Sequence, residues 1–112
     1  MTGDPRFLAI LDELKATHQK KSADYGTNSD FLANVRASEN WGIPAWVGTM
    51  IRANDKIIRL QSLLVKGKLE NESARDSLID LASYAIIALI LMEEQEKIEN
   101  VLNDDFDPDG MC

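Results

Sequence analysis

Cysteine is almost absent from this chain, and proline and aromatic residues are scarce. Basic residues are outnumbered by acidic ones. The one cysteine, Cys112, excludes an intrachain disulfide and a cysteine-based metal site. The formal net charge of -7 argues against duplex nucleic acid as a partner, because such binding requires many lysines and arginines to neutralise backbone phosphates.

Long hydrophobic runs are also missing. The longest run, Leu81 to Met92, is interrupted by Ser83 and is too short to span a bilayer. The first residues lack the basic and apolar regions of a signal peptide. We therefore expect a cytoplasmic protein with no membrane partner.

The length and composition are those of one globular domain. At 112 residues, 45% of them hydrophobic and 28% charged, the chain can bury one core but cannot form two domains. We expect a single helical domain over residues 1–102. Residues 103–112, where Pro108 and Gly110 interrupt a run of aspartates, are expected to form an acidic disordered tail.

Apolar residues repeat at helical spacing along four segments, and no segment alternates with the period of a strand. Asp4 is the expected N-cap of the first helix, and Gly42 is expected to end the second. The expected helices run from about Pro5 to Lys21 or Ala23, from Asp30 to Asn40, from Pro44 to Gly67, and onward from an Asn71 cap. The sequence therefore predicts an all-α protein.

The fourth helical segment is apolar on every side. A helix of this kind must be buried all round. In so small a protein, helices from a second subunit provide that burial most easily, so we expect a homodimer or a larger homo-oligomer.

A basic stripe with one acid inside it lies in the third segment. Arg52, Lys56 and Arg59 follow one another at spacings of four and three residues and therefore share one side of a helix. Cations in this pattern suit a phosphate. Because Asp55 can pair with Arg52 and Arg59, a solvated and salt-bridged face is the alternative interpretation.

Two aspartates lie on one face of the fourth segment. Asp76 and Asp80 are four residues apart, and Asp80 directly precedes the most apolar run of the chain. A carboxylate close to a core requires a partner, because an unpaired buried charge is strongly destabilising. That partner is either one of the three stripe cations or a magnesium ion, and the sequence leaves both open.

The end of the first helix brings His18, Lys21 and Tyr25 together at spacings of three and four residues. A cation, an imidazole and an aromatic ring could hold a phosphate and stack on a base. The alternative is a solvated helix end at which lysines favour the negative end of the helix dipole.

Both tryptophans lie within six residues of each other at a helix corner. Trp41 and Trp46 flank a Gly-Ile-Pro turn, and they either line an aromatic pocket for a base or anchor the packing of the corner. Arg36 and Glu39, one turn earlier, form either a surface ion pair or part of a pocket rim.

The segments together resemble a family of small helical phage and prophage proteins described as nucleotide-modification-associated domains. The resemblance spans about residues 15 to 95 and rests on KSADYG at 21–26, FLANVRASE at 31–39, GIPAW at 42–46, DKIIRL at 55–60 and ESARDSLIDLASYAI at 72–86, with Ile51-Arg52 between them. These proteins look distantly similar to the MazG-like all-alpha nucleoside triphosphate pyrophosphatases.

The resemblance implies an all-α, four-helix MazG-like bundle completed by oligomerisation. It also implies magnesium held by a Glu-x-x-Glu pair on one helix and a Glu-x-x-Asp pair on the next. Asp80 matches the final aspartate, with Ser77 at the partner position and Asp76 as a possible substitute. The preceding pair would be Arg52 and Asp55, so one carboxylate is replaced by a cation.

Three functional hypotheses follow. The first is a phage-type protein of the host cytoplasm that holds a small nucleotide by its phosphates, with no metal required, and sequesters a signalling nucleotide of host defence. Its expected binding residues are Lys21, Tyr25, Arg36, Trp41, Trp46, Arg52, Lys56 and Arg59.

The second hypothesis is a magnesium-dependent MazG-like nucleotide pyrophosphohydrolase in which Asp55, Asp76 and Asp80 hold the metal. The third is a helical interaction module that binds no nucleotide. The arginine at position 52 favours the first hypothesis, because it removes a metal ligand and adds a phosphate contact.

Overall fold

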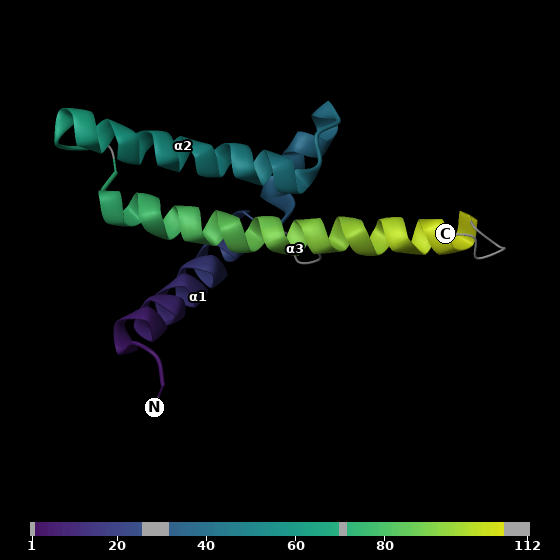
Figure 1. Cartoon of the computed structure of the whole chain (residues 1–112), viewed down its shortest axis with the longest axis horizontal. Helices are drawn as coiled ribbons and strands as arrows, with labels where there is room; N and C mark the ends of the chain where they lie inside the picture. The colour runs from purple at the N-terminus through teal and green to yellow at the C-terminus, as the bar shows by residue number, and fades with distance from the viewer. Residues whose placement is uncertain (1, 26–31, 70–71, 107–112) are drawn as a thin grey trace.

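The computed structural model describes residues 2–25, 32–69 and 72–106. Within these ranges every regular element is helical, which confirms the all-α prediction for the described residues. The elements are α1 (Pro5–Tyr25), the 3₁₀ helix η1 (Ala33–Trp41), α2 (Ala45–Lys66) and α3 (Ala74–Phe106), arranged as in Figure 1.

The helices α2 and α3 form an antiparallel hairpin and pack along much of their lengths (Figure 1). Most of the buried residues of the two helices are small, and they include Thr49, Ala53, Ser77 and Ala88; the larger Leu91 is buried with them. The Thr49 hydroxyl donates a hydrogen bond of 2.9 Å to the carbonyl oxygen of Ala45, which satisfies the polar group inside the protein. Small side chains at these positions allow the two backbones to approach closely.

The 3₁₀ helix η1 packs against α2 and completes a small apolar core. Val35 is buried there. The core joins η1, α2 and α3 through Val35, Ala45 and Leu91, with Leu32, Trp46 and Ile87 packed against them.

Glycine ends two of the helices, as the sequence predicted. Gly42 follows η1 with φ of 75°, and Gly67 follows α2 with φ of 76°. Both angles lie in the left-handed region, which glycine adopts without the steric cost that a Cβ imposes. Pro44 precedes α2 with φ of -53°, so its ring fits the start of the helix.

Side-chain oxygens cap the first turns of α1 and α3. Asp4 accepts a hydrogen bond of 2.8 Å from the backbone N–H of Arg6, which confirms its predicted capping role. At the start of α3, the Ser73 hydroxyl accepts a hydrogen bond of 3.0 Å from the N–H of Asp76. Asn71, the cap expected from the sequence, lies outside the described residues.

The helix α1 projects away from the hairpin and touches α3 over a short stretch (Figure 1). Leu14 is buried at that contact, whereas Phe7, farther toward the N-terminus on the same helix face, remains 65% exposed. The radius of gyration is 17.9 Å, compared with about 13 Å for a compact chain of this length. The chain is therefore elongated.

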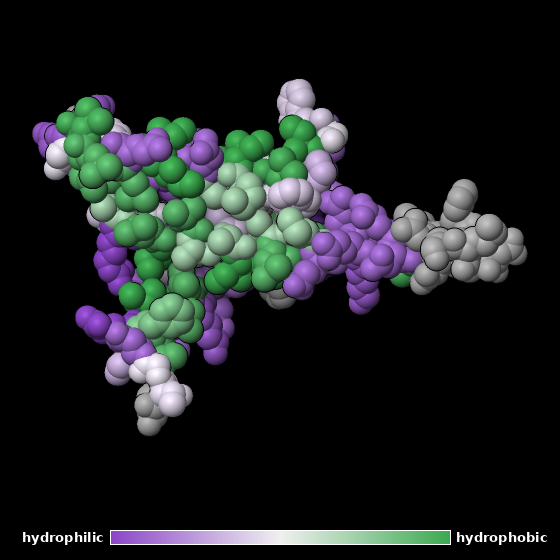
Figure 2. All heavy atoms as spheres, in the orientation of Figure 1, coloured by the Kyte–Doolittle hydropathy of each residue, from purple (hydrophilic) through white to green (hydrophobic). Residues whose placement is uncertain are grey.

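Much of the apolar surface remains uncovered. The chain exposes 8695 Å², compared with about 6,200 Å² for a compact monomer of its mass. Figure 2 shows hydrophobic residues over α2 and the N-terminal half of α3, and hydrophilic residues over the later part of α3. Exposed large side chains on α1 and α3 include Phe7, Leu8, Ile10, Leu11, Leu78, Ile86, Leu89 and Ile90.

The end of α3 bears on the predicted domain organisation. The helix extends to Phe106, into the first part of the predicted acidic tail, and residues 107–112 lie outside the described part. The domain limits therefore stay a prediction. Within the described residues, none of the helices combines the length and the apolar composition needed to cross a membrane.

The contact between η1 and α2 predicts the effect of a small substitution. A Cβ added to Gly48 would overlap the Ser38 side chain, so we expect Gly48→Ala to lower the free energy of unfolding by about 1–2 kcal/mol. In a Ser38→Gly background the overlap is removed. The same Gly48→Ala change should then stabilise the protein by up to about 1 kcal/mol, because alanine favours a helix over glycine. Urea unfolding of the four proteins measures both effects, and equal effects in the two backgrounds would contradict this prediction.

Candidate functional site

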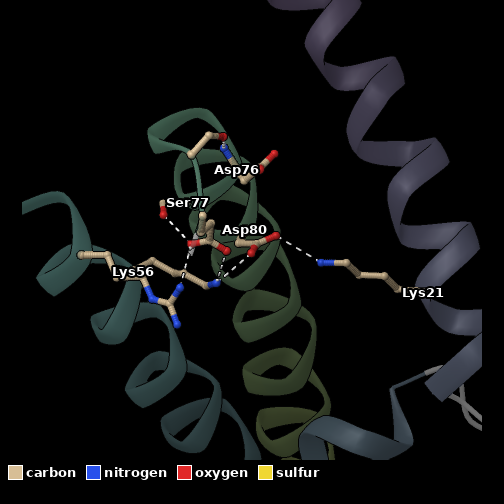
Figure 3. A network of polar contacts seen from close by, with 8 residues as sticks. Lys21, Lys56, Asp76, Ser77 and Asp80 are labelled. Carbon is tan, nitrogen blue, oxygen red and sulfur yellow. Dashed lines mark hydrogen bonds and ion pairs between the residues drawn. The ribbon is translucent and has the colours of Figure 1, made fainter. Parts of the chain in front are cut away.

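Asp80 lies between two lysines that come from different helices. Figure 3 shows Lys56 of α2 and Lys21 of α1 approaching it from opposite sides. The Lys56 ammonium lies 2.8 Å from Oδ2, and the Lys21 ammonium donates to Oδ1 at 3.1 Å. Asp80 therefore has a stripe cation as its partner, one of the two alternatives that the sequence left open, and its carboxylate joins α1, α2 and α3.

Glu72 is the second acid of this cluster and lies just before α3. It accepts a hydrogen bond of 2.9 Å from Lys56 and one of 3.3 Å from Arg59. The buried Ser77 hydroxyl also donates to it at 2.5 Å. We call these residues the charge network: Lys21, Lys56, Arg59, Glu72, Ser77 and Asp80.

The ion pairs of the charge network shift the pKa values of its members. Burial alone would raise the pKa of Asp80, but hydrogen bonds from Lys56 and Lys21 outweigh it and lower that pKa. The pKa of Glu72 is lowered by the hydrogen bond from Ser77 first and by that from Lys56 second. Burial opposes the charge of Lys56, yet the bonds to Asp80 and Glu72 leave its pKa raised. All three groups are therefore charged at neutral pH.

A cavity of about 390 Å³ opens beside Asp80, where α1, α2, α3 and the start of η1 meet. This volume lies in the range of small-molecule sites, which begins at about 300 Å³. The charged groups that line it are Lys21, Arg52 and Asp80. Two cations and one carboxylate leave a net positive charge, which favours an anion.

The remaining walls of the cavity are apolar, aromatic and neutral polar. Tyr84 and Ile87 of α3 provide the aromatic and aliphatic surface, and Val35 continues it from η1. Asn34 and Ser83 add groups that can both donate and accept hydrogen bonds. The cavity therefore suits a ligand with an anionic end and a flat or apolar body.

Lys21 is the cation most easily redirected toward such a ligand. Its side chain is 54% exposed, and its bond to Asp80 is longer than the bond from Lys56, which is 13% exposed. A long lysine stem can turn its ammonium toward a second anion at little cost. Arg52 is also exposed on the cavity wall, where its guanidinium can donate two hydrogen bonds to the oxygens of a phosphate.

The predicted basic stripe divides into two parts. Arg52 lines the cavity, whereas Lys56 and Arg59 are bonded to Glu72 and lie outside its described walls. The alternative of a salt-bridged helix face therefore describes the second half of the stripe. The acid involved is Glu72 rather than Asp55.

The aromatic and arginine candidates near the helix corner lie elsewhere. Trp41 is 85% exposed, and Trp46 packs against the core as its packing alternative predicted. Arg36 forms an ion pair of 3.0 Å with Glu94 of α3 rather than with Glu39. The side chain of Tyr25, the last residue of α1, lies outside the described part of the structure.

The three predicted magnesium ligands are not brought together. Asp55 is exposed on α2, and Asp76 is exposed at the start of α3, one turn before Asp80 (Figure 3). Each oxygen of Asp80 faces a lysine ammonium. Among the described residues, no group of three or more acids, histidines or cysteines could hold a metal ion. The magnesium hypothesis stays a prediction.

Sequence reasoning missed several contributors to the site, among them Tyr84 and Glu72. Tyr84 follows Asp80 by four residues, so helical spacing already placed its ring on the same face. Glu72 carried no such signal, because it precedes α3 and its position depends on the turn between α2 and α3. His18, considered with Lys21 in the sequence, does line the cavity.

No protein-family model, curated protein or solved structure matches this chain. The relation to the phage proteins and to the MazG-like pyrophosphatases therefore stays a prediction. The cavity and the charge network must carry any functional proposal.

Removing the shared cation tests the charge network. We expect Lys56→Met to lower the free energy of unfolding by about 2–3 kcal/mol, because Asp80 and Glu72 would lose the charge between them. Lys66→Met is the matched control, since Lys66 is exposed at the end of α2, and its cost should stay within about 0.5 kcal/mol. Urea unfolding measures both values. Equal costs for the two variants would show that the network contributes little.

The lowered pKa values of Asp80 and Glu72 predict acid sensitivity. A carboxylate whose pKa is lower in the folded chain contributes stability above its unfolded pKa and loses it as the pH falls through the folded pKa. Their ordinary values are 3.8 and 4.5, so the free energy of unfolding should decrease once the pH drops below about 4.5. Glu72→Gln should make that decrease shallower in urea titrations. An unchanged pH profile for this variant would contradict the assignment.

Proposed function

We propose that this chain binds a nucleotide in the cavity and holds it by its phosphate. The observation that supports the proposal most is that Lys21 and Arg52, from two different helices, line the same cavity as Tyr84. Cations and an aromatic ring in one site match the phosphate and the base of a nucleotide.

The phosphate half of the proposal uses exposed cations. Arg52 and Lys21 can form charge-assisted hydrogen bonds to phosphate oxygens while Lys56 stays between Asp80 and Glu72. A phosphate that enters would compete with Asp80 for Lys21. Because Asp80 keeps Lys56, its charge remains compensated when Lys21 turns toward the ligand. Binding in this way requires no metal ion.

The base of the nucleotide would contact the aromatic and aliphatic wall of the cavity. The ring of half-buried Tyr84 and the aliphatic side chain of Ile87 offer a face on which a base can stack, an interaction that contributes about 1–3 kcal/mol per base. Asn34 can donate and accept hydrogen bonds at a base edge.

Together with the resemblance to small phage proteins, this binding site leads us to a fuller proposal. A phage-type protein in the host cytoplasm would use it to sequester a signalling nucleotide of host defence. Holding a nucleotide intact is compatible with an Asp80 that is bonded to lysines at both oxygens.

A homo-oligomer of MazG-like type is part of the same proposal. The chain exposes 8695 Å², roughly 2,500 Å² more than a compact monomer of its mass. Obligate dimers bury about 1,000–2,500 Å² on each partner. The uncovered surface is thus of the size that subunit association needs.

Nucleotide binding is tested by calorimetry in the presence of EDTA, with AMP, GMP, CMP and UMP and the corresponding triphosphates. We expect micromolar binding of at least one, and a loss of at least about tenfold in affinity for Arg52→Met. Arg59→Met is the matched control, because Arg59 lies on the same helix but is bonded to Glu72. Its affinity should stay within about twofold of the wild type.

The same calorimetry separates the other hypotheses. Absence of heat with every nucleotide would refute binding and favour the interaction module. Release of phosphate or pyrophosphate after magnesium is added would identify the hydrolase. A larger effect for Arg59→Met than for Arg52→Met would move the site away from the cavity.

A further inference from the structure

A second, more apolar cavity of about 260 Å³ lies in the groove between α1 and α3. Its aliphatic wall consists of Leu11 and Leu14 from α1 and Ile86, Ile87 and Ile90 from α3. We call it the α1–α3 groove. Most of its lining is hydrocarbon, so water inside it is poorly accommodated.

One face of α1 enters this groove and then leaves it. Phe7, Ile10, Leu11 and Leu14 recur at helical spacing and form a single apolar stripe. Leu14 is buried against α3, whereas the other three remain exposed. The covered part of the stripe is buried against apolar side chains of α3, whereas the exposed part has no such cover among the described residues.

The attachment of α1 to its own subunit is weak. Beyond the contact at Leu14, it is held by the ion pair of Lys21 with Asp80 and by a bidentate pair of Arg75 with Glu13 at 2.6 and 2.7 Å. The Arg75 and Lys21 side chains are more than half exposed, and exposed pairs of this kind stabilise little. The projecting turns of an isolated helix are themselves marginal in water.

A second copy of this chain is the occupant that the surface favours. The exposed stripe of α1 and the groove are both present on each copy, so a two-fold axis would seat each stripe in the other groove and close the assembly. The surplus of roughly 2,500 Å² per chain matches what a stable dimer buries on each partner.

The groove and the proposed nucleotide cavity share a wall. His18, Ser83 and Ile87 line both of them. The helix α1 carries Lys21 on one side of the nucleotide cavity, and the same helix forms one wall of the α1–α3 groove. Fixing α1 against α3 therefore also fixes the distance between Lys21 and Arg52, the cation that α2 contributes to the cavity.

We infer that a second copy docks the exposed N-terminal part of its α1 stripe, at Phe7 and Ile10, into the α1–α3 groove, and that this docking preorganises the nucleotide cavity. A cavity whose wall is already ordered pays less entropy when it binds its ligand. The coupling is reciprocal, so nucleotide binding should in turn favour assembly. The coupling rests on the proposed function, whereas the docking does not.

Sedimentation velocity tests the docking surface. Wild-type protein should have a mass of at least twice 12.5 kDa, and Leu11→Asp and Ile90→Asp should be monomers. Leu64→Asp is the matched control, because Leu64 is an exposed leucine at the far end of α2. A monomeric wild type, or a chain that only Leu64→Asp dissociates, would overturn the inference.

Cross-linking keeps the test decisive if an aspartate variant unfolds. The background is Cys112→Ser, which removes the one native thiol. Phe7→Cys protein mixed with Ile90→Cys protein should form a disulfide-linked heterodimer under mild oxidation. Leu64→Cys mixed with Ile90→Cys should not, and equal yields from the two mixtures would refute the proposed seat.

Calorimetry then tests the coupling in separate titrations with AMP, GMP, CMP and UMP and with the corresponding triphosphates. Ile90 lines the groove but not the described walls of the nucleotide cavity, so a folded Ile90→Asp monomer should bind at least about tenfold more weakly only if assembly orders the cavity. Unchanged affinity overturns the coupling and leaves the proposed function standing. No binding to the wild type refutes the proposed function and the coupling together, while the docking is judged by mass and cross-links.

Discussion

The carboxylate of Asp80 is the constraint on which the arrangement depends. It is placed at the start of the most apolar part of α3, where a charge without partners would be strongly destabilising. The protein satisfies it with Lys56 from α2 and Lys21 from α1. One acidic group thereby sets where three helices meet, and the larger cavity lies beside that meeting point. The site is a consequence of how the fold compensates one charge.

This compensation divides the work among cations that the sequence presents as equivalent. Lys56 is largely enclosed between two carboxylates, so its charge is committed to the fold. Lys21 and Arg52 are exposed on the cavity wall and can exchange water for another anion. A shared helix face therefore does not decide whether a cation is paired within the fold or open to a ligand. The acids that approach from outside the helix decide it.

The sequence was sufficient where local rules act. The glycines at 42 and 67 and the cap at Asp4 follow from backbone geometry and from hydrogen bonds within one turn, and the structure has them where they were expected. The partners of Arg36 and Arg59 depend instead on α3 and on the turn before it, at Glu94 and Glu72. Helical periodicity shows which side chains share a face, but it does not show which other helix that face meets.

The small residues between α2 and α3 have one more consequence. Because most of the buried residues of the hairpin are small, among them Thr49, Ala53, Ser77 and Ala88, its spacing is set largely by backbone proximity. Lys56 reaches across that spacing to Glu72 and Asp80, over bonds that tolerate only small changes in length. The lengths of these ion pairs therefore depend on the separation between the two helices. A larger side chain between α2 and α3 would lengthen the bond from Lys56 to Asp80 and so change the charge that Asp80 presents to the cavity.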